Sequence, residues 1–242
     1  MKEKVLLMYS GGMDSTLAAV RLVTKGYKVE MLHFDNGCSI SLGYVDRKAH
    51  NLEKRFGKEK IEFIGKITIV PEFRENEFEI GTMTLKEIID KYGNTTISQI
   101  RCLNCRSAMY HEAILYCLNN DIHYIAEGAR KSQLFAIEQP QVISSIKELL
   151  EEFNIELLLP VFDIKNEWEK ENELMLFSDD LAIIGEDKCF LGLPQDHEIP
   201  EDEILSIKNI FDTNIKPRYV EELKKEQPRQ LIYKKPGKFE FM

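Results

Sequence analysis

A glycine-containing turn between a predicted strand and a predicted helix constrains the fold of this chain more than any other feature. The turn is Ser10-Gly11-Gly12-Met13-Asp14-Ser15, with an apolar run at 5–9 before it and a helical pattern at 16–23 after it. Adjacent glycines allow a sharp bend and a close approach of the backbone to a ligand. Ser15 is expected to cap the helix, so that its first amide groups face the turn. The sequence therefore predicts an anion-binding site at a helix N-terminus.

A second predicted strand follows, so the chain opens with a βαβ unit. The first helix is expected to end near Lys25-Gly26, and the run 28–34 reads as a strand that stops at Asp35-Asn36-Gly37. Such a unit implies a right-handed crossover and a parallel sheet, whose ligands sit at the carboxyl ends of the strands. Both turns fall at that edge.

The rest of the chain continues the alternation of strands and helices. Further strands are predicted within 61–70, 123–128 and 155–162, a loop over 71–83, and helices over 44–56, 84–92, 142–153, 166–177 and from Arg101 through Cys117. These elements predict an α/β fold with a five-stranded, parallel, doubly wound sheet. The composition changes beyond Pro194, so we expect one domain over 1–195 and a small helical C-terminal appendage over 196–242.

Composition indicates an ordinary globular protein, with 43% hydrophobic and 30% charged residues among 242. No stretch is long and apolar enough to span a membrane, and residues 1–9 lead directly into a strand, so we expect a cytoplasmic protein. The net charge of −9 argues against a broad nucleic-acid-binding surface. Residues 229–238 nevertheless carry four basic groups and no acid, which fits either a solvated tail or a local phosphate contact.

The hexapeptide also carries a family resemblance. Ser10-Gly11-Gly12-Met13-Asp14-Ser15 matches the Ser-Gly-Gly-x-Asp-Ser signature of the PP-loop ATP pyrophosphatases, and the chain resembles this family, with its adenine nucleotide alpha hydrolase-like fold, from about residue 4 to residue 195. The resemblance implies an ATP site in which the loop holds the β- and γ-phosphates and Asp14 helps to hold Mg²⁺. A substrate oxygen would attack the α-phosphate, giving an adenylated substrate and pyrophosphate.

Three cysteines form a second group of candidate site residues. Cys102 and Cys105 make a Cys-x-x-Cys pair that we place at a helix start, where the helix dipole favours thiolate, and Cys189 follows far downstream. The five cysteines, an odd number, argue against a disulfide framework. The pair alone fits a zinc site, a redox or persulfide pair, or buried thiols. Cys117 lies on an apolar helical stripe and is expected in the core.

Together with the PP-loop, these cysteines resemble the iron–sulfur sulfurtransferases of the same family. Those enzymes hold a [4Fe–4S] cluster with such a pair and one distant cysteine, and three thiolates leave one iron free to carry a hydrosulfide. Zinc is the alternative, with a fourth ligand from His111, His197 or Cys38.

Other candidate residues follow the predicted strands at the ligand edge. Gly128 permits a close backbone approach, and Arg130 or Lys131 could neutralise charge on the phosphates. Lys188 could hold the Cys189 thiolate or a substrate phosphate. The resemblance also places the nucleoside near residues at the end of the second strand, namely His33, Phe34, Asp35 and Asn36, although His33 fits a core role at least as well.

Our working hypothesis is ATP-dependent adenylation of a carbonyl oxygen followed by sulfur transfer to a tRNA base or a small molecule. It requires ATP and a sulfur donor, and it leaves a homodimer open. One alternative is an ammonia-dependent ligase with zinc, because the stretch 33–37 resembles 7-cyano-7-deazaguanine synthase; the cysteine spacing departs from that pattern. A non-catalytic ATP- or AMP-binding protein and a scaffold that binds nucleic acid through residues 229–242 are alternatives of other classes.

Overall fold

A parallel five-stranded sheet forms the centre of the molecule. The structure is a computed structural model that describes residues 3–38, 43–71, 73, 83–93, 95–133, 135–182, 189 and 198–225. The strands are β1 (Lys4–Met8), β2 (Lys28–Asp35), β3 (Ile61–Thr68), β4 (Tyr124–Glu127) and β5 (Glu156–Leu158). Their order is β3-β2-β1-β4-β5, and every neighbouring pair is parallel. The predicted fold class is confirmed.

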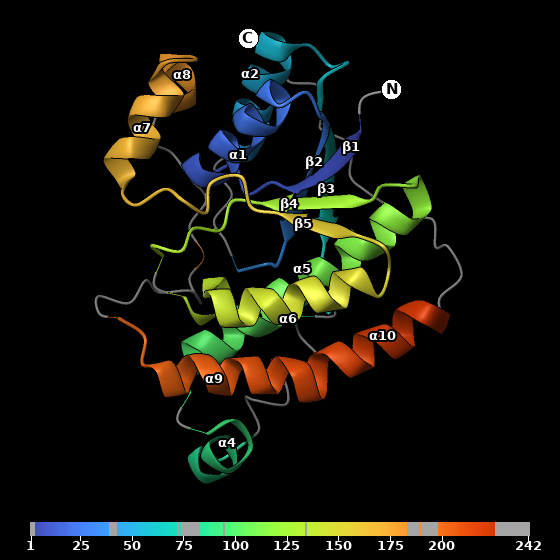
Figure 1. The fold of residues 1–242 in the computed structure, drawn as a ribbon, viewed down its shortest axis with the longest axis vertical. Helices are drawn as coiled ribbons and strands as arrows, with labels where there is room; N and C mark the ends of the chain where they lie inside the picture. Colours follow the sequence, from blue (N-terminus) through green and yellow to red (C-terminus); the bar gives the residue numbers. More distant parts are fainter. Residues whose placement is uncertain are drawn as a thin grey trace.

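Helices cover both faces of this sheet (Figure 1). The described helices are α1 (Met13–Thr24), α2 (Tyr44–Phe56), α4 (Leu85–Tyr92), α5 (Ile97–Asn120), α6 (Pro140–Glu151), α7 (Glu167–Met175), α8 (Asp179–Ala182), α9 (Glu201–Ile210) and α10 (Lys216–Lys225), with a 3₁₀ turn, η1 (Ala136–Glu138). Helices α1, α2, α7 and α8 lie on one face of the sheet and α5 and α6 on the other, while α9 and α10 form an outer layer against α5 and α6.

Two apolar cores result from the alternation of side chains along β1. Val5 and Leu7 point into the core shared with α1 and α2, whereas Leu6 and Met8 point into the core shared with α5 and α6. Strands β2 and β3 lie on one side of β1, and strands β4 and β5 lie on the other side. The order in which strands are added to the sheet therefore reverses between β1 and β4. That switch point is where ligands of doubly wound sheets bind.

The C-terminal helices α9 and α10 are joined without a break by η2 (Phe211–Ile215), a segment of π-helix. The side chains Ile207, Phe211 and Tyr219 are buried in the same core as α5 and α6. The predicted division at 195/196 falls outside the described residues and stays a prediction. Within the described ranges, no helix combines the length and apolarity that crossing a bilayer requires.

Most predicted boundaries agree with the structure to within about two residues, and those of α5 and β5 differ by more. Helix α2 has the predicted bounds, 44–56, and Gly57 follows it at the C-cap. Helix α5 begins at Ile97, four residues before the predicted start at Arg101, because Thr96 caps it by accepting a hydrogen bond from the Gln99 amide. Strand β5 is only three residues long. The predicted loop at 71–83 lies mostly outside the described residues.

Candidate active site at the carboxyl edge of the sheet

The glycine turn has a backbone that only glycine can adopt at Gly11. Its φ is +76°, and an added Cβ would lie 2.8 Å from the Val45 Cα of helix α2. Gly12 is the N-cap of α1 and has no side-chain cap. Ser15 is the third residue of that helix, and its Oγ donates to the Gly12 carbonyl oxygen at 3.1 Å. The prediction that Ser15 caps α1 is therefore wrong.

Serine hydroxyls close the turn from inside. The Ser10 Oγ accepts a hydrogen bond from the Gly12 amide at 3.2 Å and lies 3.0 Å from the Ser15 Oγ. These contacts fix the loop directly above the end of β1. They leave the first-turn amides of α1 without intrahelical partners, as the start of any α-helix does, so this N-terminus keeps its affinity for anions.

The loop after β4 presses against the same helix start. A Cβ on Gly128 would lie 2.7 Å from the Ser15 nitrogen and 2.9 Å from the Asp14 carbonyl carbon. The backbone at Gly128 does make a close approach, as predicted, and the group that it approaches is the backbone of Asp14 and Ser15. Since Glu127 pairs with Met8 in the sheet, the ends of β1 and β4 lie side by side.

Asp14 sits in a buried cluster of charges. Its Oδ1 lies 2.8 Å from the Arg130 Nε and 3.1 Å from the Lys170 Nζ, and its Oδ2 accepts from the Gln133 Nε2 at 2.9 Å. Glu167 lies 2.5 Å from the Arg130 Nη2 and 2.6 Å from the Lys170 Nζ. Burial raises the pKa of Asp14, although Lys170 and Arg130 act against this rise.

The Asp14 Oδ2 accepts one hydrogen bond, whereas its Oδ1 lies near two cations but is buried without a hydrogen bond. A Mg²⁺ ion would need at least one carboxylate oxygen, and Oδ1 is the oxygen that fits this need. The magnesium role of Asp14 therefore stays a prediction.

The other predicted phosphate-site residues divide into three groups. Arg130 is buried and paired, not solvated. Lys131 is exposed, and its amide donates to the Phe162 carbonyl oxygen at 3.4 Å. Lys188 lies outside the described residues, as does His197. Sequence reasoning missed Lys170 and Gln133.

The predicted nucleoside residues lie at the end of β2, beside the loop. The His33 Nδ1 lies 3.0 Å from the Tyr9 carbonyl oxygen, which joins β2 to the end of β1. Phe34 is buried in the core. The Asp35 Oδ1 accepts from the Gly37 amide at 2.9 Å and so forms the predicted turn.

Three cysteines line one cavity of about 280 Å³ at this edge of the sheet. Cys102 and Cys105 come from α5, and Cys189 comes from a separate segment far along the chain. The Asn36 Nδ2 donates to the Cys105 Sγ at 3.2 Å and to the Cys189 Sγ at 3.8 Å. The remaining lining residues are mostly apolar or basic: Phe73, Arg101, Arg106, Met109, Phe135, Ile137 and Glu138.

The environment of Cys102 and Cys105 favours their protonated form. Burial, reinforced by the neighbouring thiols, raises the pKa of Cys102 to about 12, and burial raises that of Cys105 to about 11. The prediction that a helix start favours their thiolates is wrong, because α5 begins at Ile97 and the dipole effect is confined to the first turn. Cys117 is fully buried in the apolar core, as predicted.

The three cysteine thiols are ligands of the kind that bind zinc or an iron–sulfur cluster, but their side chains are not arranged around a common metal position. Among the described residues, no three or more His, Cys, Asp or Glu side chains are placed to hold a metal ion. His111 packs 4.9 Å from the Tyr219 ring and lies 3.0 Å from Glu112, so it faces the C-terminal helices. The Cys38 amide donates to the Asn36 Oδ1 at 2.9 Å, which keeps Cys38 near the cavity.

A buried ion network connects the cavity to the glycine turn. Arg106, which lines the cavity, contacts the Glu127 carboxylate at the end of β4 and lies 3.7 Å from Glu138. Burial raises the pKa of Glu138 to about 7, although Arg106 acts against this rise. The cavity and the loop are therefore connected through Arg106 and the end of β4, while Asn36 links Cys105 to Cys189.

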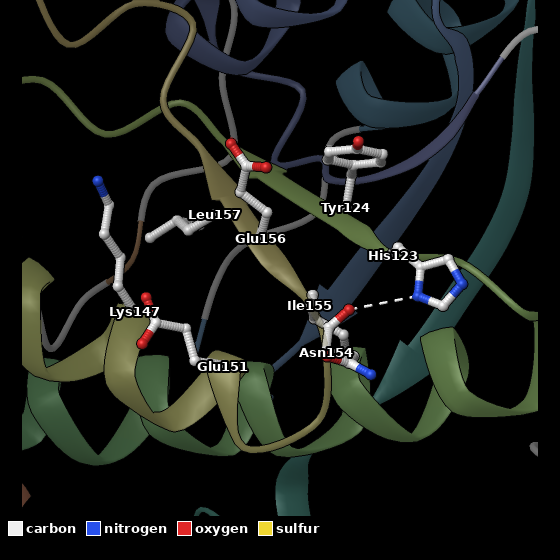
Figure 2. A pocket seen from close by; sticks show the side chains of 8 residues that line it. All are labelled: His123, Tyr124, Lys147, Glu151, Asn154, Ile155, Glu156 and Leu157. Atoms are coloured by element: carbon white, nitrogen blue, oxygen red, sulfur yellow. Dashed lines mark hydrogen bonds between the residues drawn. The ribbon is translucent and has the colours of Figure 1, made fainter.

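A hollow of about 640 Å³ lies at the opposite edge of the sheet (Figure 2). His123 and Glu156 lie at the amino ends of β4 and β5, and the His123 Nδ1 faces the Asn154 carbonyl oxygen at 3.2 Å. Because parallel sheets bind ligands at the carboxyl ends of their strands, the candidate active site is the edge with the turn and the cysteines.

The fold and this edge define an α/β protein of the PP-loop class, as the hexapeptide predicted. Residues 1–191 match the family described as "Thiamine biosynthesis protein (ThiI)", and the chain belongs to that family.

Two known proteins illustrate the similarity. A "Probable tRNA sulfurtransferase" from Methanothermobacter thermautotrophicus is 19% identical over 186 residues, which are 77% of this chain and 43% of the relative. A crystal structure of a "4-thiouridine synthetase - RNA complex with bound ATP" superimposes with a TM-score of 0.58 at 15% identity, over 91% of this chain and 53% of that one. The second likeness shows the shared fold. The chain spans about half the length of both proteins.

Proposed function

We propose that this chain transfers sulfur to a tRNA base in an ATP-dependent reaction. One observation carries the proposal: the glycine turn and a cavity lined by three cysteines from distant parts of the chain lie at one edge of the sheet, and Asn36 links Cys105 to Cys189 there. The choice of ATP and tRNA as substrates is supported by the proteins that this chain resembles. One is named as a probable tRNA sulfurtransferase, and the other was solved with RNA and ATP.

The reaction has two steps. The carbonyl oxygen of the base attacks the α-phosphorus of ATP, and the bond between that phosphorus and the bridging oxygen of pyrophosphate breaks. A hydrosulfide from a sulfur donor then attacks the adenylated carbon, the carbon–oxygen bond breaks, and AMP leaves with the oxygen. The anion site of the turn and the charge of Arg130 would stabilise the departing pyrophosphate.

Within this function, Cys102, Cys105 and Cys189 would deliver the sulfur. We propose that these thiols would hold a [4Fe–4S] cluster, with zinc as the alternative, once their side chains rearrange from the described positions, and that the metal would supply a site for sulfur. The two steps balance with hydrosulfide as the nucleophile, whichever metal the thiols bind.

The test combines two products in one assay. The wild-type chain is incubated with ATP, a tRNA transcript and sulfide; pyrophosphate is measured by a coupled assay and thionucleoside by mass spectrometry. Cys102→Ser, Cys105→Ser and Cys189→Ser should each lower thionucleoside at least about 100-fold while pyrophosphate release persists, because the thiols act after adenylation. Cys117→Ser is the matched control, since Cys117 lies on the same helix as the pair but in the core.

Other outcomes would reject parts of the proposal. A wild-type chain that binds ATP but releases no pyrophosphate with any substrate would be a nucleotide-binding protein. Anaerobic reconstitution followed by metal analysis tests the cluster: iron supports it, whereas zinc without iron favours the ammonia-dependent ligase.

A further inference from the structure

Lys170 is a buried cation that the predicted ATP site did not include. It lies on α7, is only 3% exposed, and its Nζ faces Asp14 at 3.1 Å and Glu167 at 2.6 Å. Lysine is almost never this buried unless it is paired, because the ammonium loses its hydration. Its position on a separate element therefore brings a second positive charge, after Arg130, to the start of α1.

The two cations differ in how firmly they are held. The planar guanidinium of Arg130 contacts Asp14 through Nε and Glu167 through Nη2, so its geometry fixes it between the two carboxylates. The ammonium of Lys170 is a compact charge on a flexible stem and can turn toward a new acceptor. Lys170 is thus the cation of the pair whose shape places fewer constraints on its acceptors.

The two carboxylates also differ. The Glu167 side chain is 59% exposed and the Asp14 side chain 19% exposed, while those of both cations are less than one tenth exposed. Partial burial acts to raise the pKa of Glu167, but hydrogen bonds and charges from Lys170 and Arg130 lower it overall. The Glu167 carboxylate can be hydrated by solvent if a stronger anion takes its place beside the cations. The buried cations have no such access to solvent.

A polyphosphate at the N-terminus of α1 is such an anion. Asp14 is the second residue of α1, so an ion pair joins Lys170 to the turn that would hold the phosphates. We propose that Lys170 is a phosphate-binding residue that exchanges Asp14 and Glu167 for the β- and γ-phosphates when ATP binds. This inference rests on the proposed function in that it requires ATP at this turn.

The main test separates the phosphates from the nucleoside. Calorimetry measures the Kd of ATP and of AMP for Lys170→Met, whose side chain has a similar length without the charge. ATP binding should weaken about 10- to 100-fold, as expected for loss of a charge-assisted hydrogen bond, and AMP binding less than about 3-fold. Lys170→Arg should recover part of the ATP affinity.

Arg21→Met is the matched control, because Arg21 joins the same two helices through Glu173 at 2.6 Å, away from Asp14. It should lower the unfolding temperature without changing the ratio of ATP to AMP affinity. A second variant, Glu167→Gln, removes the exposed competitor of the phosphates and should tighten ATP binding by about 3- to 10-fold.

The outcomes are distinguishable. Equal losses of ATP and AMP affinity in Lys170→Met, or weaker ATP binding in Glu167→Gln, would show that Lys170 only packs α7 onto α1, and would overturn the inference alone. A wild-type chain that binds no ATP would overturn the proposed function and the inference with it.

Discussion

The charged cluster around Asp14 and the cysteine cavity lie at the same edge of one sheet, yet they bury polar groups in opposite ways. Around Asp14, two cations and two carboxylates face one another within 3.1 Å. In the cavity, burial raises the pKa values of the Cys102 and Cys105 thiols, which disfavours their thiolates. The first region thus holds paired charges, whereas burial in the second favours the uncharged form of these two side chains.

Arg106 stands between the two regions, and its removal should have the largest effect on stability. Arg106→Met leaves Glu127, 2% exposed, and Glu138, 8% exposed, without their cation. We expect a loss of about 3–5 kcal/mol in the free energy of unfolding, measured by urea denaturation near neutral pH. The more exposed pair Lys208–Asp212 supplies the control, since Lys208→Met should cost about 1 kcal/mol or less. Equal losses in both variants would mean that the cavity side does not depend on a buried ion pair.

The glycine turn offers the next largest effect. Gly11→Ala combines a positive φ with an overlap against the Val45 backbone, and we expect it to cost about 2–4 kcal/mol in stability. Gly26→Ala separates the two causes, because Gly26 has a φ of +96° and no neighbour within 4 Å, so only backbone strain of about 1–2 kcal/mol should remain. If both variants lose the same stability, contact between the turn and α2 contributes nothing.

The smallest predicted effect depends on pH and belongs to the cavity. The pKa of Glu138 is about 7 in the folded chain and 4.5 ordinarily, so the folded state binds more protons between these values. Stability should therefore fall as pH rises from about 4.5 to about 7, by roughly 2–3 kcal/mol. Glu138→Gln should lack this fall, which urea denaturation across that range can measure. If stability depends on pH in the same way in the wild type and in Glu138→Gln, the pKa of Glu138 is the same in the folded and unfolded states.

Local patterns were sufficient to predict the sheet and most helices. The bounds of α2 follow from helical spacing that ends at Gly57, and the parallel topology follows from the βαβ unit. The run 155–162 was predicted as one strand, but only Glu156–Leu158 pairs with β4, because apolar residues can also be buried in turns. Local spacing could not separate the two cases.

The candidate site was predictable in its motifs but not in its pairings. The hexapeptide and the cysteine spacing are local signals, whereas the contact of Lys170 with Asp14 joins residues far apart in the chain. The available signal was weak: Lys170 lies four residues before the buried Leu174, on the packed face of α7. The start of α5 at Ile97 could have been predicted from Thr96, a residue type that often caps helices. The polar residues around Thr96 made this pattern hard to recognise.

The π-helical segment Phe211–Ile215 has a consequence for which changes in length the C-terminal region can accept. A wider turn at this point accommodates about one more residue than an α-helical turn, so Ile207 before it and Tyr219 after it both remain buried in the same core. Deleting one residue there would restore regular winding and leave Tyr219 and Leu223 facing their neighbours, whereas inserting one would turn α10 by about 100° and lift them off. The segment should therefore accept a one-residue deletion more readily than a one-residue insertion.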